Sequence, residues 1–169
     1  MNKLILFCLI FLMAGIQQIN AQKFGHVNSS LIIQNHPLIG PANTQLEAYQ
    51  KSLVDPLDAK SKAFEAKYHA FQEEANNGTL SQVASQKKQA ELQTEQDSLA
   101  AEGQQVKFKV MKKREELLQP ILTEVDSAIQ VIGKEGHYTM IFDTSVSGAL
   151  LFAEDGNDLT EAVKARLKK

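Results

Sequence analysis

The sequence has almost no cysteine and no long hydrophobic run beyond its first residues. The one cysteine among 169 residues is Cys8, in the apolar stretch at the N-terminus, so removal of that stretch leaves a chain without cysteine. Such a chain cannot form disulfides, and packing or assembly must therefore hold it together. Gly148 and Gly156 stand in predicted turns, and no glycine-rich phosphate loop is present. The sequence offers no place to bind ATP.

Neither sign of charge dominates the chain. Residues 1–21 hold one lysine of the 18 basic residues and no acidic residue, so the remainder carries 17 basic against 20 acidic residues, a net charge of −3. This balance gives no general signal for a nucleic-acid partner. We expect no nucleic acid to bind.

Residues 1–21 have the pattern of a cleavable signal peptide. Lys3 provides a positive start, Leu4 to Ile16 form an apolar segment, and Ile19-Asn20-Ala21 precedes a cleavage site before Gln22. The alternative is a retained membrane anchor, but an apolar run of about a dozen residues is shorter than the ~20 that span a bilayer. We therefore expect a soluble, exported protein.

The sequence contains no convincing catalytic or metal-binding pattern. Its four histidines are His26, His36, His69 and His137, and no two have metal-ligand spacing on one element. The segment Asp143-Thr144-Ser145 near His137 could suggest a nucleophile and a base, but a strand end followed by a turn explains it more simply. We predict no enzyme activity, no metal and no cofactor.

Residues 44–133 have the apolar spacing of two long helices. Apart from a missing apolar residue at Lys60, steps of three or four residues run from Leu46 to Ala75, and Leu92, Leu99 and Val106 then recur every seven residues. Between them Asn76-Asn77-Gly78 predicts a turn, followed by a capping box from Thr79 to Gln82. Two such helices should fold back as an antiparallel hairpin, too long for a compact domain and so projecting as an arm.

Helix-capping residues, prolines and a glycine predict where the helices of this arm begin, bend or weaken. We expect a loop over residues 38–43 and a helix that begins at Asn43 or Thr44. Pro56 and Pro120 should kink or divide their helices. The polar stretch from Ser81 to Gln105, with Gly103, should make the distal arm the least stable part.

The remaining segments predict a small sheet. Lys23 to Asn28 is a strand candidate, and in His137 to Asp143 the residues Tyr138, Met140 and Phe142 share one face. Ala149 to Ala153 should be a third strand, paired with the second in a hairpin, before a C-terminal helix that Asp158 caps. A sheet this small has too little chain to cover both faces, which favours oligomerisation.

These elements predict an α+β fold with a small β-sheet body and a coiled-coil-like arm. The expected division is a signal peptide (1–21), the first strand with its connection (22–43), the arm (44–119, tip near 76–80) and the rest of the body (120–169).

The order of elements resembles the OmpH/Skp family of periplasmic chaperones. The resemblance is carried by KFGHVNSS (residues 23–30), the long charged hairpin, LLQPILTEVDSAIQVIGKEGHYTMIFDTS (117–145) and GALLFAEDGNDLTEAVKARL (148–167). It implies a periplasmic homotrimer in which strands of three subunits form the body and three arms surround a cavity for unfolded outer-membrane proteins. The best-known members are strongly basic, whereas this chain is slightly acidic, which argues against capture by overall charge.

Two groups of candidate residues follow. For client contact on the arm, aromatic and basic positions are Phe64, Tyr68, Phe71, Lys87, Lys88, Lys107 and Lys109. The aromatic residues could instead pack in the seam, and the basic cluster from Lys107 to Arg114 could be a solvated face or a patch for acidic clients or phospholipid headgroups. For assembly of the body, the candidates are Phe24, Val27, Met140, Phe142, Leu150 and Phe152.

The leading hypothesis is an ATP-independent holdase that keeps unfolded outer-membrane proteins from aggregating, with affinity from many weak contacts. The alternative is a structural coiled-coil adaptor or spacer of the cell envelope, which would require tight, continuous knobs-into-holes packing.

Overall fold

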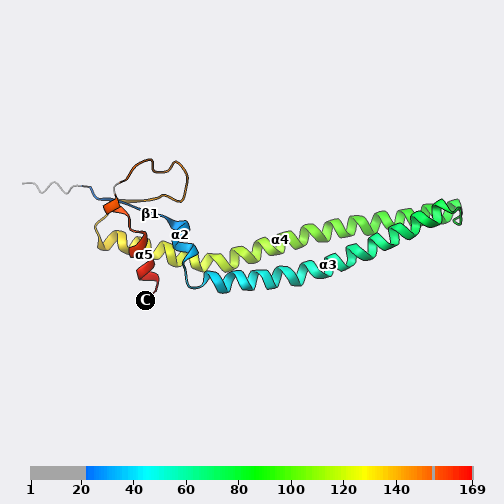
Figure 1. The fold of residues 1–169 in the computed structure, drawn as a ribbon, viewed down its shortest axis with the longest axis horizontal. Coiled ribbons are helices and arrows are strands. Elements are labelled where there is room, and N and C mark those ends of the chain that lie inside the picture. The colour runs from blue at the N-terminus through cyan, green and yellow to red at the C-terminus, as the bar shows by residue number, and fades with distance from the viewer. Residues whose placement is uncertain (1–21, 154, 169) are drawn as a thin grey trace, which may run out of the picture.

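The computed structural model describes residues 22–153 and 155–168, and shows a small body from which a long arm projects (Figure 1). The predicted signal peptide lies outside these residues. The elements in chain order are β1 (Phe24–Val27), α2 (Ser29–Gln34), α3 (Ile39–Asn76), α4 (Gln82–Glu135), β2 (Met140–Asp143), the 3-10 turn η1 (Asp155–Asn157) and α5 (Thr160–Leu167). None of the described helices is long and apolar enough to cross a membrane.

The body contains a parallel two-stranded sheet. β1 and β2 pair from Phe24 with Met140 to Val27 with Asp143. The chain between the two strands is the whole arm, a connection long enough to bring two strands together in parallel. The other side of β1 forms a single bridge between His26 and Asp158. Within the described residues, β2 therefore has one unpaired edge.

The predicted third strand is wrong for the isolated chain. Residues 149–153 are irregular, and Leu151 is 92% exposed. Leu150, Phe152 and Ala153 line an open cavity beside β1 and β2, but none of them is part of a strand. The apolar run predicted a strand, but a strand needs a partner edge, and in this chain β2 pairs with β1 instead.

The core of the body lies between the sheet, α2, the last turns of α4, and α5. Its buried side chains come from all of these elements and are Val27, Ile32, Val125, Ala128, Leu159 and Val163. On α4 the first buried residue is Ile121, just after Pro120. Asp158 accepts a 2.8 Å hydrogen bond from the backbone N–H of Thr160 at the start of α5. Leu159 and Val163, on either side of this start of the helix, both lie in the core.

The first arm helix begins earlier than the sequence predicts. The expected loop over residues 38–43 is wrong, because α3 starts at Ile39 and includes Gly40 and Pro41. Proline is tolerated in the first helical turn, where its missing N–H has no helical partner to lose. Ala42, one residue later, is already buried. Packing of this turn therefore outweighs the local preference for a loop.

Neither proline inside the arm divides its helix. α3 continues through Pro56 and α4 through Pro120. Each proline removes one backbone hydrogen bond, but the neighbouring turns stay helical and the arm curves gently (Figure 1). Of the two predicted effects of Pro56, a kink or a division, the division of α3 is therefore wrong.

The tip of the arm is a short turn that contains Gly78. Gly78 has φ of 65°, a left-handed conformation that glycine adopts without strain. The predicted capping box is wrong: Ser81, not Thr79, caps α4 and accepts a bond from the N–H of Ala84. The Thr79 hydroxyl instead donates to the carbonyl of Glu74 at the end of α3. The two hydroxyl side chains thus close the two helix ends separately.

Candidate functional site

Ion pairs between the two helices of the arm recur every seven residues. Lys60 binds Glu102 at 2.6 Å and Lys67 binds Glu95 at 2.7 Å. Glu74 pairs with Lys88 one further heptad towards the tip. As the number rises on α3 it falls on α4, so the helices run in opposite directions along one fixed register. We call these three pairs the ionic rungs.

Apolar layers alternate with the ionic rungs. The register places Phe64 near Leu99, and Phe71 near Leu92, and all four side chains are half-buried. Phe71 and Leu92 line an open cavity of about 340 Å³ together with Lys67, Glu95 and Lys88 of the two distal rungs. The seam of the distal arm therefore alternates half-buried apolar layers with charged pairs that stay partly exposed to solvent.

The three candidate aromatic residues of the arm differ in exposure. Phe64 and Phe71 are half-buried in the seam, whereas Tyr68 is exposed. The rings of Phe64 and Tyr68 stack with centroids 6.3 Å apart. Tyr68 thus extends the seam outward and is the one of the three with most surface available to another molecule.

The candidate lysines fall into two groups. Lys87 and Lys88, near the tip, lie close to Glu91 and Glu74. Near the base, Lys113 pairs with Glu116 at 3.9 Å, and Glu102 forms an ion pair with Lys60. Within the described residues the other members of the basal cluster have no ion-pair partner: Lys107, Lys109, Lys112 and Arg114. The basal arm is therefore locally positive although the chain is not.

The sequence analysis missed the most exposed apolar residues of the arm. Phe108 and Met111 on α4 are 56% and 62% exposed, and Val83 near the tip is exposed as well. Leu118 and Leu122 continue a stripe with Phe108 and Met111 at helical spacing. A search for a second apolar stripe on α4 would have found them.

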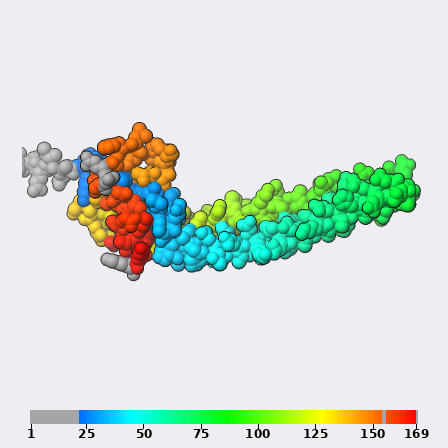
Figure 2. Space-filling view, in the orientation of Figure 1, coloured from blue at the N-terminus to red at the C-terminus, as the bar shows by residue number. Residues whose placement is uncertain are grey.

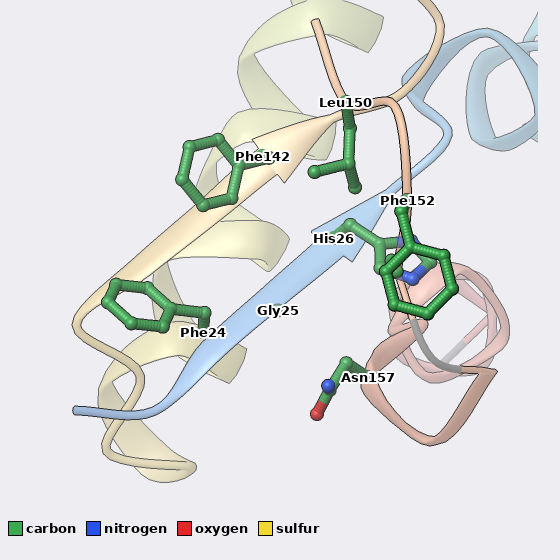
Figure 3. A pocket seen from close by; sticks show the side chains of 8 residues that line it. Phe24, Gly25, His26, Phe142, Leu150, Phe152 and Asn157 are labelled. Atoms are coloured by element: carbon green, nitrogen blue, oxygen red, sulfur yellow. The ribbon is translucent and has the colours of Figure 1, made fainter. Parts of the chain in front are cut away.

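The body carries an apolar surface on the outer face of its sheet (Figure 3). Phe24 and Phe142 stand side by side on neighbouring strands, with ring centroids 6.4 Å apart. Leu150 and Phe152 from the loop face them across an open cavity of about 290 Å³. Phe24, Met140, Phe142 and Phe152 are all exposed. We call these residues, with Leu150, the sheet face.

Val27 does not belong to the sheet face. Its side chain points to the other side of the sheet and is only 2% exposed, inside the core. The alternation along β1 explains this, since Phe24 and Val27 are an odd number of residues apart and so lie on opposite faces. Of the six candidate body residues, Val27 has no surface left for a partner.

A cluster of hydrogen bonds around Asp143 joins β2 to the start of α2. The hydroxyls of Ser29 and Ser145 donate to its carboxylate at 2.5 Å and 2.9 Å, and both backbone N–H groups donate as well. Burial alone would raise the pKa of Asp143, but these hydrogen bonds outweigh it and lower the pKa below its ordinary value. The arrangement suits a structural clasp.

The suggested nucleophile and base do not come together. The Ser145 hydroxyl is engaged by Asp143 and Ser29, and within the described residues it makes no hydrogen bond to His137. His137 lies in the turn after α4 with φ of 54°.

A buried histidine lies where the arm leaves the body. The Nδ1 atom of His36 accepts a 3.2 Å bond from the N–H of Leu38, at the start of α3. Its Nε2 atom lies 3.3 Å from Glu124 Oε2 but is not aligned for a hydrogen bond. His36 thus joins α2, α3 and α4 at the base of the arm.

These observations define a class of protein with a small body, which carries an exposed apolar sheet face. A long helical arm projects from this body (Figure 2). Residues 23–167 match the family described as outer membrane protein (OmpH-like). The chain belongs to this family.

The fold also resembles a solved structure. The crystal structure of a proposed outer membrane chaperone (OmpH-like) from Caulobacter crescentus CB15 superposes with a TM-score of 0.67. It is 18% identical, and the match covers 90% of this chain and 88% of that one. This likeness supports the mostly helical fold with its small sheet. No curated protein matches the sequence.

Proposed function

We propose that the protein is a periplasmic, ATP-independent holdase that binds unfolded outer-membrane proteins between helical arms and keeps them from aggregating. The carrying observation is the arm itself. It exposes Tyr68, Val83, Phe108 and Met111, and two of the cavities between its helices are open to solvent. Such a surface suits many weak contacts with an extended chain rather than one deep ligand site.

Three lines of support bear on this proposal. Membership of the OmpH-like family and the fold of the Caulobacter protein favour a chaperone of the outer-membrane pathway. Unfolded β-barrel chains carry alternating apolar residues that aggregate in water. Weak contacts to such residues need neither hydrolysis nor a cofactor, and we infer that the protein is not an enzyme.

We further propose that three copies assemble through the sheet face. Phe24, Met140 and Phe142 expose a contiguous apolar surface, which is unusual on a small monomeric body. β2 also has its unpaired edge there. In a trimer, packing between subunits would bury the apolar surface, and strand pairing would use the free edge of β2. Three arms would then enclose one cavity.

The proposal is tested by diluting an unfolded outer-membrane β-barrel protein from denaturant, with and without the purified protein. We expect light scattering to be suppressed near one client per three chains, and ATP to have no effect. The mass of the complex is measured in parallel. A well-folded oligomer that leaves aggregation of several clients unchanged would refute the holdase and favour the envelope spacer.

A further inference from the structure

A groove on one side of the basal arm, between α3 and α4, combines an apolar floor with two cationic side chains that have no ion-pair partner among the described residues. We propose that it binds peptide segments in which a large apolar side chain is followed by a carboxylate. This inference rests on the proposed function and names the class of client segment that the arm prefers.

The floor of the groove has the size of a side-chain site. Val54, Val106 and Val110 line it, with Met111 at one edge, and the cavity measures about 350 Å³. It is open to solvent along the arm, so an extended chain can place one or two side chains in it while its backbone stays outside. Burying apolar surface there supplies the non-directional part of the affinity.

The rim of the groove provides charge complementarity. Lys107 and Arg114 both line it and stand seven residues apart on α4, two helical turns along the same face. Neither has an ion-pair partner among the described residues, and Glu116 pairs with Lys113 instead. A guanidinium and an ammonium spaced along an apolar floor fit a carboxylate beside an apolar side chain, and Arg114 can bind it with two parallel hydrogen bonds.

The geometry favours a peptide over a lipid surface. The apolar floor is recessed between two helices, and the recess is short, whereas a membrane-binding helix presents a continuous convex apolar face to the bilayer. A peptide side chain can enter the recess and leave its neighbour's carboxylate at the rim.

The rest of the basic cluster provides a matched control. Lys109 and Lys112 carry the same charge and have no ion-pair partner in the described chain, but they do not line the groove. Phe108 is a similar control for Met111: both side chains are exposed to similar extents, and only Met111 lies at the groove. Effects of overall charge and of general stickiness can therefore be separated from binding in the groove.

The test measures fluorescence anisotropy of short labelled peptides with the purified protein. The peptides carry Leu-Phe-Asp, Leu-Phe-Asn, Leu-Phe-Lys or Ser-Ser-Asp at their centre. We expect the first to bind about fivefold or more tightly than the others, because exposed charge contacts are individually weak. K107A/R114A should abolish this preference and K109A/K112A should keep it. M111S should lower the affinity for the Leu-Phe-Asp peptide more than F108S does.

Equal losses in the two double variants, or no preference for the carboxylate, would overturn the proposal. The proposal would also be overturned if the wild-type protein did not bind the peptides but bound anionic phospholipid vesicles through Lys107 and Arg114. All four variants are exposed surface changes, and helical circular dichroism checks their folding. Suppression of client aggregation is measured separately. If it persists without peptide preference, the groove inference fails and the holdase proposal stands; if it is absent, the holdase proposal fails whatever the peptides do.

Discussion

Asp143 shows how a single residue couples the body's stability to pH. Its carboxylate is charged in the fold and receives hydrogen bonds from Ser29 and Ser145. Because its pKa is lower in the folded chain than the ordinary value of 3.8, the stability it contributes is fully present above that value. This stability is lost as the pH falls through the lower, folded-state pKa. Asp158, whose pKa is lowered mainly by its hydrogen bond with Thr160, acts in the same direction.

The substitution Asp143→Asn tests this coupling. We expect it to lower the free energy of unfolding at neutral pH by about 1–3 kcal/mol, because it replaces a charged acceptor of several hydrogen bonds. The loss relative to wild type should shrink as the pH approaches 3. Urea unfolding at several pH values measures both effects, with Asp58→Asn on the exposed face of α3 as the control. An equal loss at all pH values would contradict the assignment.

Two glycines predict opposite effects of the same substitution. A Cβ at Gly103 would meet only Leu57 Cδ2, at 3.9 Å, which is ordinary contact. Gly103→Ala should therefore stabilise α4 by about 0.5–1 kcal/mol, because glycine loses more backbone entropy in a helix. A Cβ at Gly25 would lie 2.8 Å from Leu159 Cδ1, so Gly25→Ala should destabilise the body. Thermal melts of both variants check the prediction, which fails if Gly103→Ala lowers the melting temperature.

At the scale of the elements, charge specifies the register of the arm. A shift of α4 by one heptad keeps most apolar layers, because leucines and phenylalanines recur every seven residues. It does not keep the charges. The third ionic rung has its acid on α3, whereas the first two have their acids on α4. A shift one way therefore sets Lys67 against Lys88, and a shift the other way sets Glu74 against Glu95.

Exchanging the charges of the third ionic rung tests this role. E74K/K88E keeps three attractive pairs in the observed register but removes the Lys67–Lys88 repulsion from a shifted one. We expect little change in melting temperature, since exposed pairs contribute about 0.2–1 kcal/mol each. In this variant we expect spin labels placed at Ala63 and Ala101 to show a second distance, which comes from molecules in the shifted register. A single, unchanged distance in the variant would show that the turn at Gly78 alone determines the register.

The elements show what the sequence could and could not predict. The two long helices, the turn at Gly78 and the first two strands follow from local periodicity, and the structure has them. The start of α3 was misplaced because burial of Ala42 outweighed the loop signal of Gly40 and Pro41. The ionic rungs were missed because spacing within one helix points to pairs such as Glu47 with Lys51, whereas these pairs join two helices. The exposure of Phe108 and Met111 could not be predicted, because α4 has two apolar stripes and its sequence does not say which of them packs against α3.

At the scale of the whole molecule, the body of a single chain has an uncovered apolar face, which the proposed trimer would bury. It leaves Phe24, Met140 and Phe142 exposed on one face of a two-stranded sheet. We expect M140E/F142E to convert the assembly into monomers, because two buried charges at each contact would cost more than the apolar contact contributes. Light scattering coupled to size exclusion measures the mass. V83E also replaces an exposed apolar residue by an acidic one, but at the arm tip, and it should leave the mass of the assembly unchanged.

The loop at residues 149–153 bears on the trimer proposal. Its sequence has the apolar character of a strand, yet within the described residues it is irregular, and Phe152 is 82% exposed. The unpaired edge of β2 lies on the same body. The trimer proposal supplies the missing partner, because a strand that cannot pair within its own chain can pair with the edge of a neighbour's sheet.

This pairing predicts that protection of the loop depends on concentration. Amide hydrogens of residues 149–153 should exchange slowly above the dissociation constant of the assembly and rapidly below it, since only the paired state shields them. M140E/F142E should show fast exchange at every concentration, while the core helix α5 stays protected in both proteins. Fast exchange of the loop in a demonstrated trimer would mean that the sheet face alone holds the subunits together. Slow exchange in the monomeric variant would mean that the strand forms within one chain.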